Sequence, residues 1–154
     1  MNERILTNHE RETWNKYQRM RVQVSGRLNR DLTKATGLSE ADFEILSALI
    51  ALPDESVRSL ALRCGLEWEK SRLSHQLRRM EQRGLVTREA CDEDNRSANV
   101  RVTALGRRLA EEATAYNEEA VDRYIFEVLT PEQTTALAEI ADAVLGNLDR
   151  AHQS

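Results

Sequence analysis

The spacing of apolar and polar residues predicts a chain made mostly of helices. Residues 10–35 repeat apolar side chains every three, four or seven positions, which is the stripe of an amphipathic helix. Gly37 follows as a natural helix stop, and Ser39 then caps the apolar segment EADFEILSALIAL. The segment RSLALRCGL indicates a short third helix. A fourth helix follows at about residues 67–83.

The period changes after this fourth helix. Two short β-prone segments, LVTRE and NVRVT, flank a loop of Asp, Glu, Asn and Ser, which predicts a β-hairpin with a long polar tip. Thr103 then starts a long helix that runs to about Val128. The sequence TPEQ breaks it with a capping-box pattern, in which Thr130 is the N-cap and Gln133 lies three residues on. The last helix carries one apolar face: Leu137, Ile140, Val144 and Leu148.

The predicted fourth helix has two chemically different faces. Because successive residues turn by about 100°, Leu73, Leu77 and Met80 share one face, which we expect to pack on the core. The other face and its flanks carry cations and short hydrogen-bonding side chains: Lys70, Ser71, Arg72, Ser74, His75, Arg78 and Arg79. A short helix, a turn, a basic helix and a hairpin follow one another in a winged helix-turn-helix, whose second helix enters the DNA major groove. These side chains are therefore candidate DNA-binding residues.

The local charge supports this interpretation, although the chain as a whole is acidic. Its 154 residues carry a formal net charge of −4. Residues 58–108 nevertheless hold 12 basic and 7 acidic side chains, whereas residues 109–154 hold 2 and 10. An anionic partner responds to the local field rather than to the total charge. The alternative is a basic face that is merely solvated, and the neighbouring helix and hairpin argue against it.

Composition and spacing argue against several other classes of protein. A chain of this length is about one domain, and no apolar run approaches the roughly 20 residues of a membrane span. The polar start is no secretory signal, and two cysteines form no disulfide framework, so we expect a cytoplasmic protein. The three histidines show no metal-ligand spacing, and neither a phosphate loop nor a nucleophile elbow is present. We therefore expect no metal, no cofactor and no enzymatic activity.

Three segments taken together, SRLSHQLRRMEQRGLVTRE, DEDNRS and VRVTALGRRL, resemble the multiple-antibiotic-resistance regulator (MarR) family of bacterial transcription factors. The family pattern is matched by Gly84, Leu85, Val86, Arg88, Asp94, Arg96, Thr103 and Gly106. Each motif alone is weakly specific, but the ordered set is strong and the resemblance spans nearly the whole chain. It implies a mostly α fold, a winged helix-turn-helix with a small β-hairpin wing and long terminal dimerisation helices.

The resemblance also implies how the chain is organised. We expect residues 1–154 to form a single MarR-like domain, with a DNA-binding lobe at 39–103 and dimerisation helices at 1–38 and 104–154. The apolar stripes of the first and last helices support a homodimer independently, because a monomer would expose a large apolar patch. The alternative is that both terminal regions fold over their own domain.

For function, the resemblance implies a repressor that binds an inverted-repeat operator in double-stranded DNA and is released by a small molecule. Arg96 at the wing tip would enter the minor groove or grip phosphate, and Asp94 would orient it. Asn95 departs from the family by replacing a wing arginine, which weakens the grip on phosphate. Glu67 stands where a turn glycine is usual, and Glu69 brings an acid to the start of the basic helix. That acid repels phosphate, or it accepts a hydrogen bond from a cytosine.

Ligand control is the least specified part of the function. Family members bind small aromatic anions between the dimer helices and the winged head, where Trp14, Tyr17 and Arg21 would line a pocket. Arg21 would meet a ligand carboxylate or pair with an acid on a partner helix. Cys91 opens the predicted wing loop and is either an inert thiol or a redox switch. The two remaining alternatives are this thiol-responsive regulator and a winged-helix module that binds protein instead of DNA.

Overall fold

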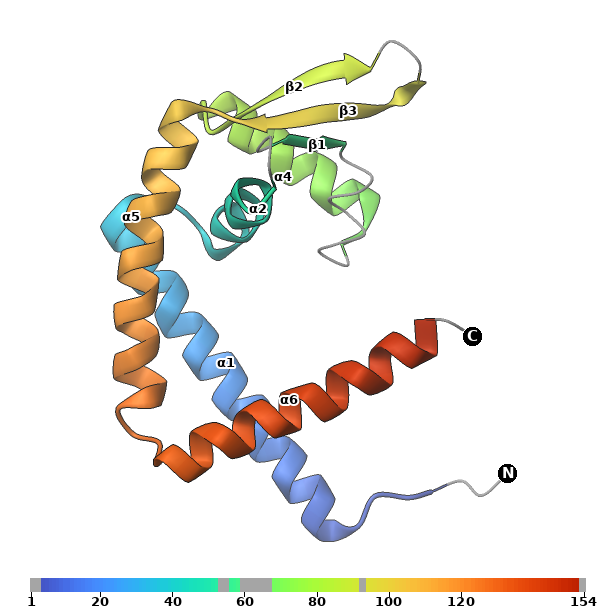
Figure 1. Cartoon of the computed structure of the whole chain (residues 1–154), viewed down its shortest axis with the longest axis vertical. Helices are drawn as coiled ribbons and strands as arrows, with labels where there is room; N and C mark the ends of the chain where they lie inside the picture. Colours follow the sequence, from blue (N-terminus) through green and yellow to red (C-terminus); the bar gives the residue numbers. More distant parts are fainter. Residues whose placement is uncertain (1–3, 53–55, 59–67, 92–93, 153–154) are drawn as a thin grey trace. The chain divides into compact units, whose positions relative to one another are not determined.

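The structure is a computed structural model that describes residues 4–52, 56–58, 68–91 and 94–152, with the backbone alone at 56–58, 90–91 and 94–98. The chain divides into two compact units, residues 1–117 and 118–154. The described residues of the first unit form three helices, a three-stranded sheet and most of a fourth helix (Figure 1). Apart from its first residue, the predicted short third helix lies outside the described residues.

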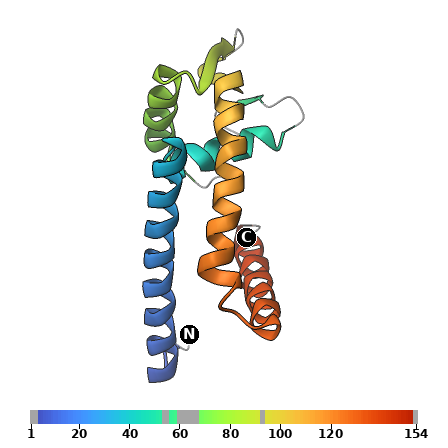
Figure 2. The same cartoon turned by 90° about the vertical axis from the view of Figure 1, so that its left-hand side faces the viewer.

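Helix α1 (Asn8–Thr36) confirms the first predicted helix and is one unbroken element (Figure 2). A capping box starts it, because Thr7 and Glu10 exchange side-chain and backbone hydrogen bonds. The Thr7 backbone N–H also lowers the pKa of Glu10 from its usual value. Gly37 ends the helix as predicted, with φ of 78°, in the left-handed region that glycine adopts without strain.

Helices α2 (Glu40–Ile50) and α4 (Lys70–Gln82) pack against each other and against the sheet. Ser39 caps α2 as predicted, through a capping box with Asp42. The start of α2 is also bonded to α1, since Asn29 Oδ1 accepts from the Glu40 N–H at 2.8 Å and Ser25 donates to the Glu40 carboxylate. The four helices of the first unit, two strands of its sheet and the segments beside them contribute its buried core: Leu32, Leu38, Ile45, Leu46, Leu49, Trp68, Leu73, Leu77, Met80, Leu85, Val86, Val100, Ala110 and Ala113.

The sheet differs from the predicted hairpin in two ways. Strands β2 (Val86–Cys91) and β3 (Asp94–Val102) pair antiparallel as expected, but β1 (Ser56–Arg58) adds a third strand on the free side of β3. A three-residue strand is too short to show alternation in the sequence. The long polar tip was also a wrong prediction, because pairing continues to Cys91 and Asp94. Backbone groups make that ladder, so residues of low β propensity do not prevent it.

Helix α5 (Ala104–Val121) begins directly after Thr103, where its start was predicted. The Thr103 hydroxyl accepts a hydrogen bond from the Gly106 N–H at 3.0 Å and donates to the Gly84 carbonyl at 2.6 Å, which fixes the end of the wing to the turn after α4. Gly106 is packed so closely that a Cβ there would overlap the Leu85 carbonyl oxygen. A short π-helix, η1 (Asp122–Phe126), continues α5 toward the predicted break.

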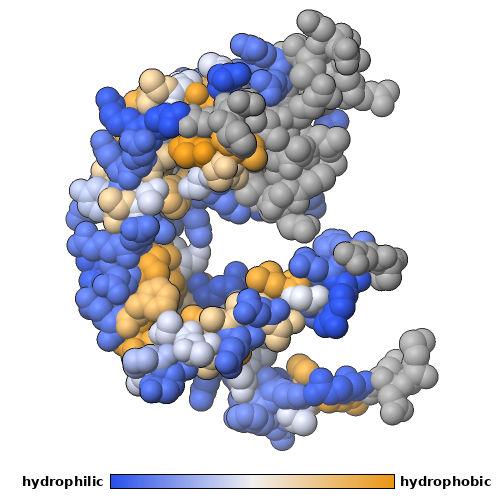
Figure 3. All heavy atoms as spheres, in the orientation of Figure 1, coloured by the Kyte–Doolittle hydropathy of each residue, from blue (hydrophilic) through white to orange (hydrophobic). Residues whose placement is uncertain are grey.

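The second unit contains η1 and helix α6 (Pro131–His152). The predicted capping box is confirmed: the Thr130 hydroxyl accepts from the Gln133 N–H, and the Gln133 amide oxygen accepts from the Thr130 N–H. The apolar face of α6 remains exposed, and Figure 3 shows such side chains among polar ones on this helix. None of the helices in the described part of the chain has the length and apolar character needed to cross a membrane.

Candidate nucleic-acid interface

Helix α4 has the two faces that its sequence predicts. Leu73, Leu77 and Met80 are buried in the core. The candidate DNA-binding side chains of α4 lie away from the core, and all are exposed except the half-buried Ser74: Lys70, Ser71, Arg72, His75, Arg78 and Arg79. The helix therefore anchors one side in the winged lobe and presents the other to solvent.

A buried carboxylate fixes the position of α4. Asp42 of α2 is only 1% exposed. Its Oδ1 accepts a hydrogen bond from Gln76 Nε2 at 2.6 Å, and its Oδ2 accepts from Arg83 Nη1 at 2.6 Å and from the Ser39 N–H at 2.9 Å. The second Arg83 nitrogen, Nη2, donates to the Gly37 carbonyl at 2.9 Å. Burial of a carboxylate is tolerated when such donors satisfy it, so these bonds orient α4 against α2 and the end of α1.

The cationic side chains of α4 differ in the contacts they make. Arg79 donates to Gln76 Oε1 at 2.8 Å, so it is tied to the Asp42 network. Arg72 lies over the ring of Trp68, with Cζ 3.8 Å from the ring centroid. Lys70 and Arg78 form no ion pair with any acid among the described residues. Four positive charges on this face, those of Lys70, Arg72, Arg78 and Arg79, are therefore not neutralised by an acid within the described part of the chain.

Two acidic residues border this face. Glu69 is the N-cap of α4, and its exposed side chain forms no capping hydrogen bond. Glu81 instead joins α4 to the wing, because its carboxylate accepts from the Arg88 backbone N–H at 3.1 Å and from Arg88 Nη2 at 3.3 Å. Arg88, which matched the family pattern, thus fixes the base of β2 to α4.

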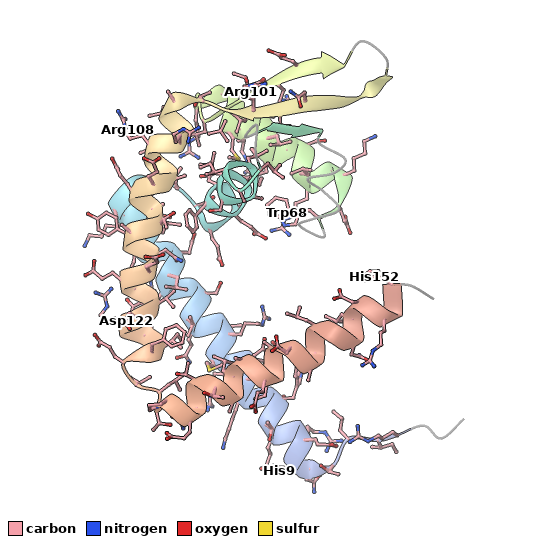
Figure 4. All side chains as sticks on the ribbon, viewed as in Figure 1. His9, Trp68, Arg101, Arg108, Asp122 and His152 are labelled. Atoms are coloured by element: carbon pink, nitrogen blue, oxygen red, sulfur yellow. The ribbon has the colours of Figure 1, made fainter. Side chains whose placement is uncertain are left out.

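The wing-tip predictions concern side chains outside the described part of the structure. Arg96 and Asp94 belong to β3 and Cys91 ends β2, but only their backbone is described. Their roles stay predictions, and the second of the two cysteines, Cys64, lies outside the described residues. Arg101 of β3 and Arg108 of α5 are further exposed cations of the first unit (Figure 4).

The three predicted ligand-pocket residues lie on the N-terminal half of α1. The rings of Trp14 and Tyr17 are 5.4 Å apart between centroids, and the two side chains are 53% and 44% exposed. Arg21 Nε donates to Gln18 Oε1 at 2.8 Å. The two rings and the guanidinium therefore form an exposed surface on α1, and the pocket stays a prediction. Within the described residues, no three His, Cys, Asp or Glu side chains are grouped so that they could hold a metal ion.

Sequence reasoning missed the residues that hold the interface in place: Trp68, Asp42, Gln76 and Arg83. A signal for Gln76 was present, because it lies three residues after Leu73 and four before Met80, on the apolar stripe. A polar side chain on a buried face requires a buried partner. Asp42, three residues after the Ser39 cap, was the acid that could reach it.

We compared the sequence and the structure of this chain with those of known proteins. The sequence model of the MarR family matches residues 36–97, and no curated protein sequence matches the chain. AbsC, a MarR family transcriptional regulator from Streptomyces coelicolor, is 29% identical, covers 95% of this chain and 98% of its own, and superimposes with a TM-score of 0.84.

Two structures solved with DNA are also similar. Sco3205, a MarR family transcriptional regulator from Streptomyces coelicolor in complex with DNA, is 30% identical over 94% of this chain and 91% of its own, with a TM-score of 0.85. A mutant MarR from E. coli complexed with operator DNA covers 92% and 99% with a TM-score of 0.77, and its 19% identity shows the fold alone. The predicted winged-helix fold is confirmed. The family consists of regulators rather than enzymes, and this chain belongs to the MarR family of transcriptional regulators.

Proposed function

We propose that this regulator binds double-stranded DNA with α4 in the major groove and the wing beside it. The observation that carries the proposal is the exposed face of α4, where Lys70, Arg72 and Arg78 have no acidic partner among the described residues. Phosphate neutralisation by such cations supplies nearly all of the non-specific affinity of proteins for DNA and a large share of the specific affinity. The DNA complex of the similar regulator Sco3205 supports the same partner.

The regulator acts as a homodimer. Helices α1 and α6 carry large apolar side chains that the described residues leave exposed, including Met20, Val22, Ile140, Val144 and Leu148. A monomer with so many exposed apolar side chains would be prone to association. Residues 1–38 and 104–154 therefore supply the dimer contacts, and residues 39–103 form the DNA-binding lobe of one domain, 1–154.

A two-fold dimer binds an inverted repeat. Its two copies of α4 enter successive major grooves on one side of the duplex, so the half-site centres lie about 10 base pairs apart. Occupancy of such an operator blocks transcription, which makes the protein a repressor. A small aromatic anion held by Trp14, Tyr17 and Arg21 releases it.

The direct test starts from a pool of random duplexes. The full-length protein should enrich one sequence with two inverted half-sites, and footprinting should show protection on one side of the helix with the spacing given above. Enrichment of a single asymmetric half-site would contradict the dimer. Failure to enrich any sequence would contradict DNA binding and favour a winged-helix module that binds protein.

Repression and release need separate measurements. A reporter gene placed behind the enriched operator should be less active when the protein is expressed, and a rise in activity would instead identify an activator.

Aromatic carboxylates of the benzoate type should lower operator affinity of the wild-type protein. Arg21→Ala should abolish that effect without changing affinity in the absence of ligand, because Arg21 lies outside the DNA-binding face.

A further inference from the structure

The strongest unassigned feature of the DNA-binding face is the contact between Trp68 and Arg72. Trp68 lies just before the Glu69 N-cap and is 6% exposed, as part of the hydrophobic core. Figure 4 labels it near the start of α4. Trp68 and Leu73 occupy the positions of a hydrophobic staple, and both belong to the same buried cluster. The indole is therefore a fixed platform.

Arg72 uses this platform without losing its hydrogen-bonding capacity. With Cζ 3.8 Å from the ring centroid, the guanidinium lies against the face of the indole. A guanidinium has five N–H donors, and a contact with an aromatic ring uses its positive charge rather than a hydrogen-bond acceptor. Among the described residues, Arg72 has neither a hydrogen-bond acceptor nor an acid as partner.

The other cations of this face lack that combination. Arg79 already donates to Gln76. Lys70 and Arg78 have unpaired charges, but no ring supports either of them among the described residues. Among the described cations of this face, only Arg72 both contacts an aromatic ring and has no hydrogen-bond acceptor or acid as partner. It lies in the first turn of α4. The first turn of a recognition helix is the part that contacts base edges.

We propose that Trp68 is a positioning residue that aims Arg72 at a guanine in the major groove. Arginine reads guanine through two parallel hydrogen bonds to O6 and N7, which demand a fixed guanidinium plane. If the Arg72 side chain is already ordered in the free protein, binding does not have to pay its conformational entropy. That difference corresponds to about two- to tenfold in affinity for DNA. Trp68 thus contributes to sequence preference although it does not touch DNA. This inference rests on the proposed function.

The test uses the full-length protein and the duplex that the wild type enriches from the random pool. Arg72→Ala and Arg72→Lys should each weaken binding to that duplex about tenfold or more, with loss of preference at one G·C pair. Trp68→Leu should relax preference at the same pair and weaken binding by about two- to tenfold. Its affinity for random duplex and its salt dependence should stay unchanged, because no charge is removed.

Three controls separate positioning from folding. Trp68→Phe keeps an aromatic face and should retain most of the preference, whereas Trp68→Leu should not. The Trp68→Leu, Arg72→Ala double variant should bind like Arg72→Ala alone, because positioning cannot matter once the arginine is gone. Thermal unfolding of each variant reports any loss of the fold.

The two proposals fail in different ways. If Trp68→Leu weakens operator and random duplex equally, or if its effect adds to that of Arg72→Ala, Trp68 is only a core residue and the inference is overturned. If the wild type enriches no sequence at all, the proposed DNA binding fails first.

Discussion

Asp42 is the residue on which the orientation of α4 most depends. Asp42→Ala would remove the acceptor of Gln76 and Arg83 and leave a buried amide without its partner. We expect a loss of about 2–4 kcal/mol in the free energy of unfolding, measured by urea denaturation at one protein concentration. Glu44→Ala, at an exposed acid of the same helix, should change it by less than about 0.5 kcal/mol. Equal effects of the two variants would show that the network is not structural.

Arg96 is expected to grip DNA rather than read its sequence. Arg96→Ala should weaken binding to the enriched operator and to random duplex by the same factor. It should also reduce the slope of log affinity against log salt by about one unit, since one phosphate contact is lost. The measurement is a salt series with both duplexes. A loss confined to the operator would instead mean that the wing reads the width of the minor groove.

At the scale of elements, the helices were predictable because their capping residues and apolar stripes are local patterns, recognisable within a short stretch of sequence. Gly37, Ser39, Thr103 and Thr130 end or begin helices where the sequence indicated. Strand β1 was not predictable, because three residues carry no period and its pairing with β3 is a long-range event. The length of the wing strands was missed because backbone groups pair as far as Cys91 and Asp94, through residues of low β propensity that the sequence places in a loop.

The candidate site divides in a similar way. The exposed face of α4 followed directly from helical periodicity. Its supports did not, because Asp42 and Gln76 are 34 positions apart in the sequence and meet only in the folded lobe. The sequence placed Trp68 inside the predicted helix at about 67–83, and nothing in it showed that Trp68 precedes α4 or that Arg72 lies on its ring.

The junction between the wing and α5 depends on the absence of a side chain at Gly106. Gly106→Ala would force its methyl group against the Leu85 carbonyl, which is backbone and has little freedom to move. We expect a loss of about 1–3 kcal/mol in the free energy of unfolding, as for other overpacked sites. Gly26→Ala is the matched control, because open space surrounds that position within α1. It should stabilise the protein by about 0.5–1 kcal/mol, and the opposite order would contradict the packing described for this junction.

At the scale of the whole molecule, dimerisation is expected to depend on α6. Deleting residues 131–154 removes the exposed stripe of Leu137, Ile140, Val144 and Leu148 that we assign to the interface. The truncated protein should aggregate or sediment as a monomer and should lose specific binding to the inverted repeat. Analytical ultracentrifugation and operator binding measure the two effects. A truncated protein that remained a specific DNA-binding dimer would show that the interface has been assigned wrongly.

The start of α2 is hydrogen-bonded to two helices, α1 and α4. Asn29 and Ser25 of α1 hold Glu40, and Asp42, two residues on, holds Gln76 and Arg83 at α4. The short segment 40–42 is therefore bonded both to α1 and to α4, the helix that we propose contacts DNA. A rotation of α1 would therefore change the orientation of α4 through these hydrogen bonds, and the lobe would not have to unfold.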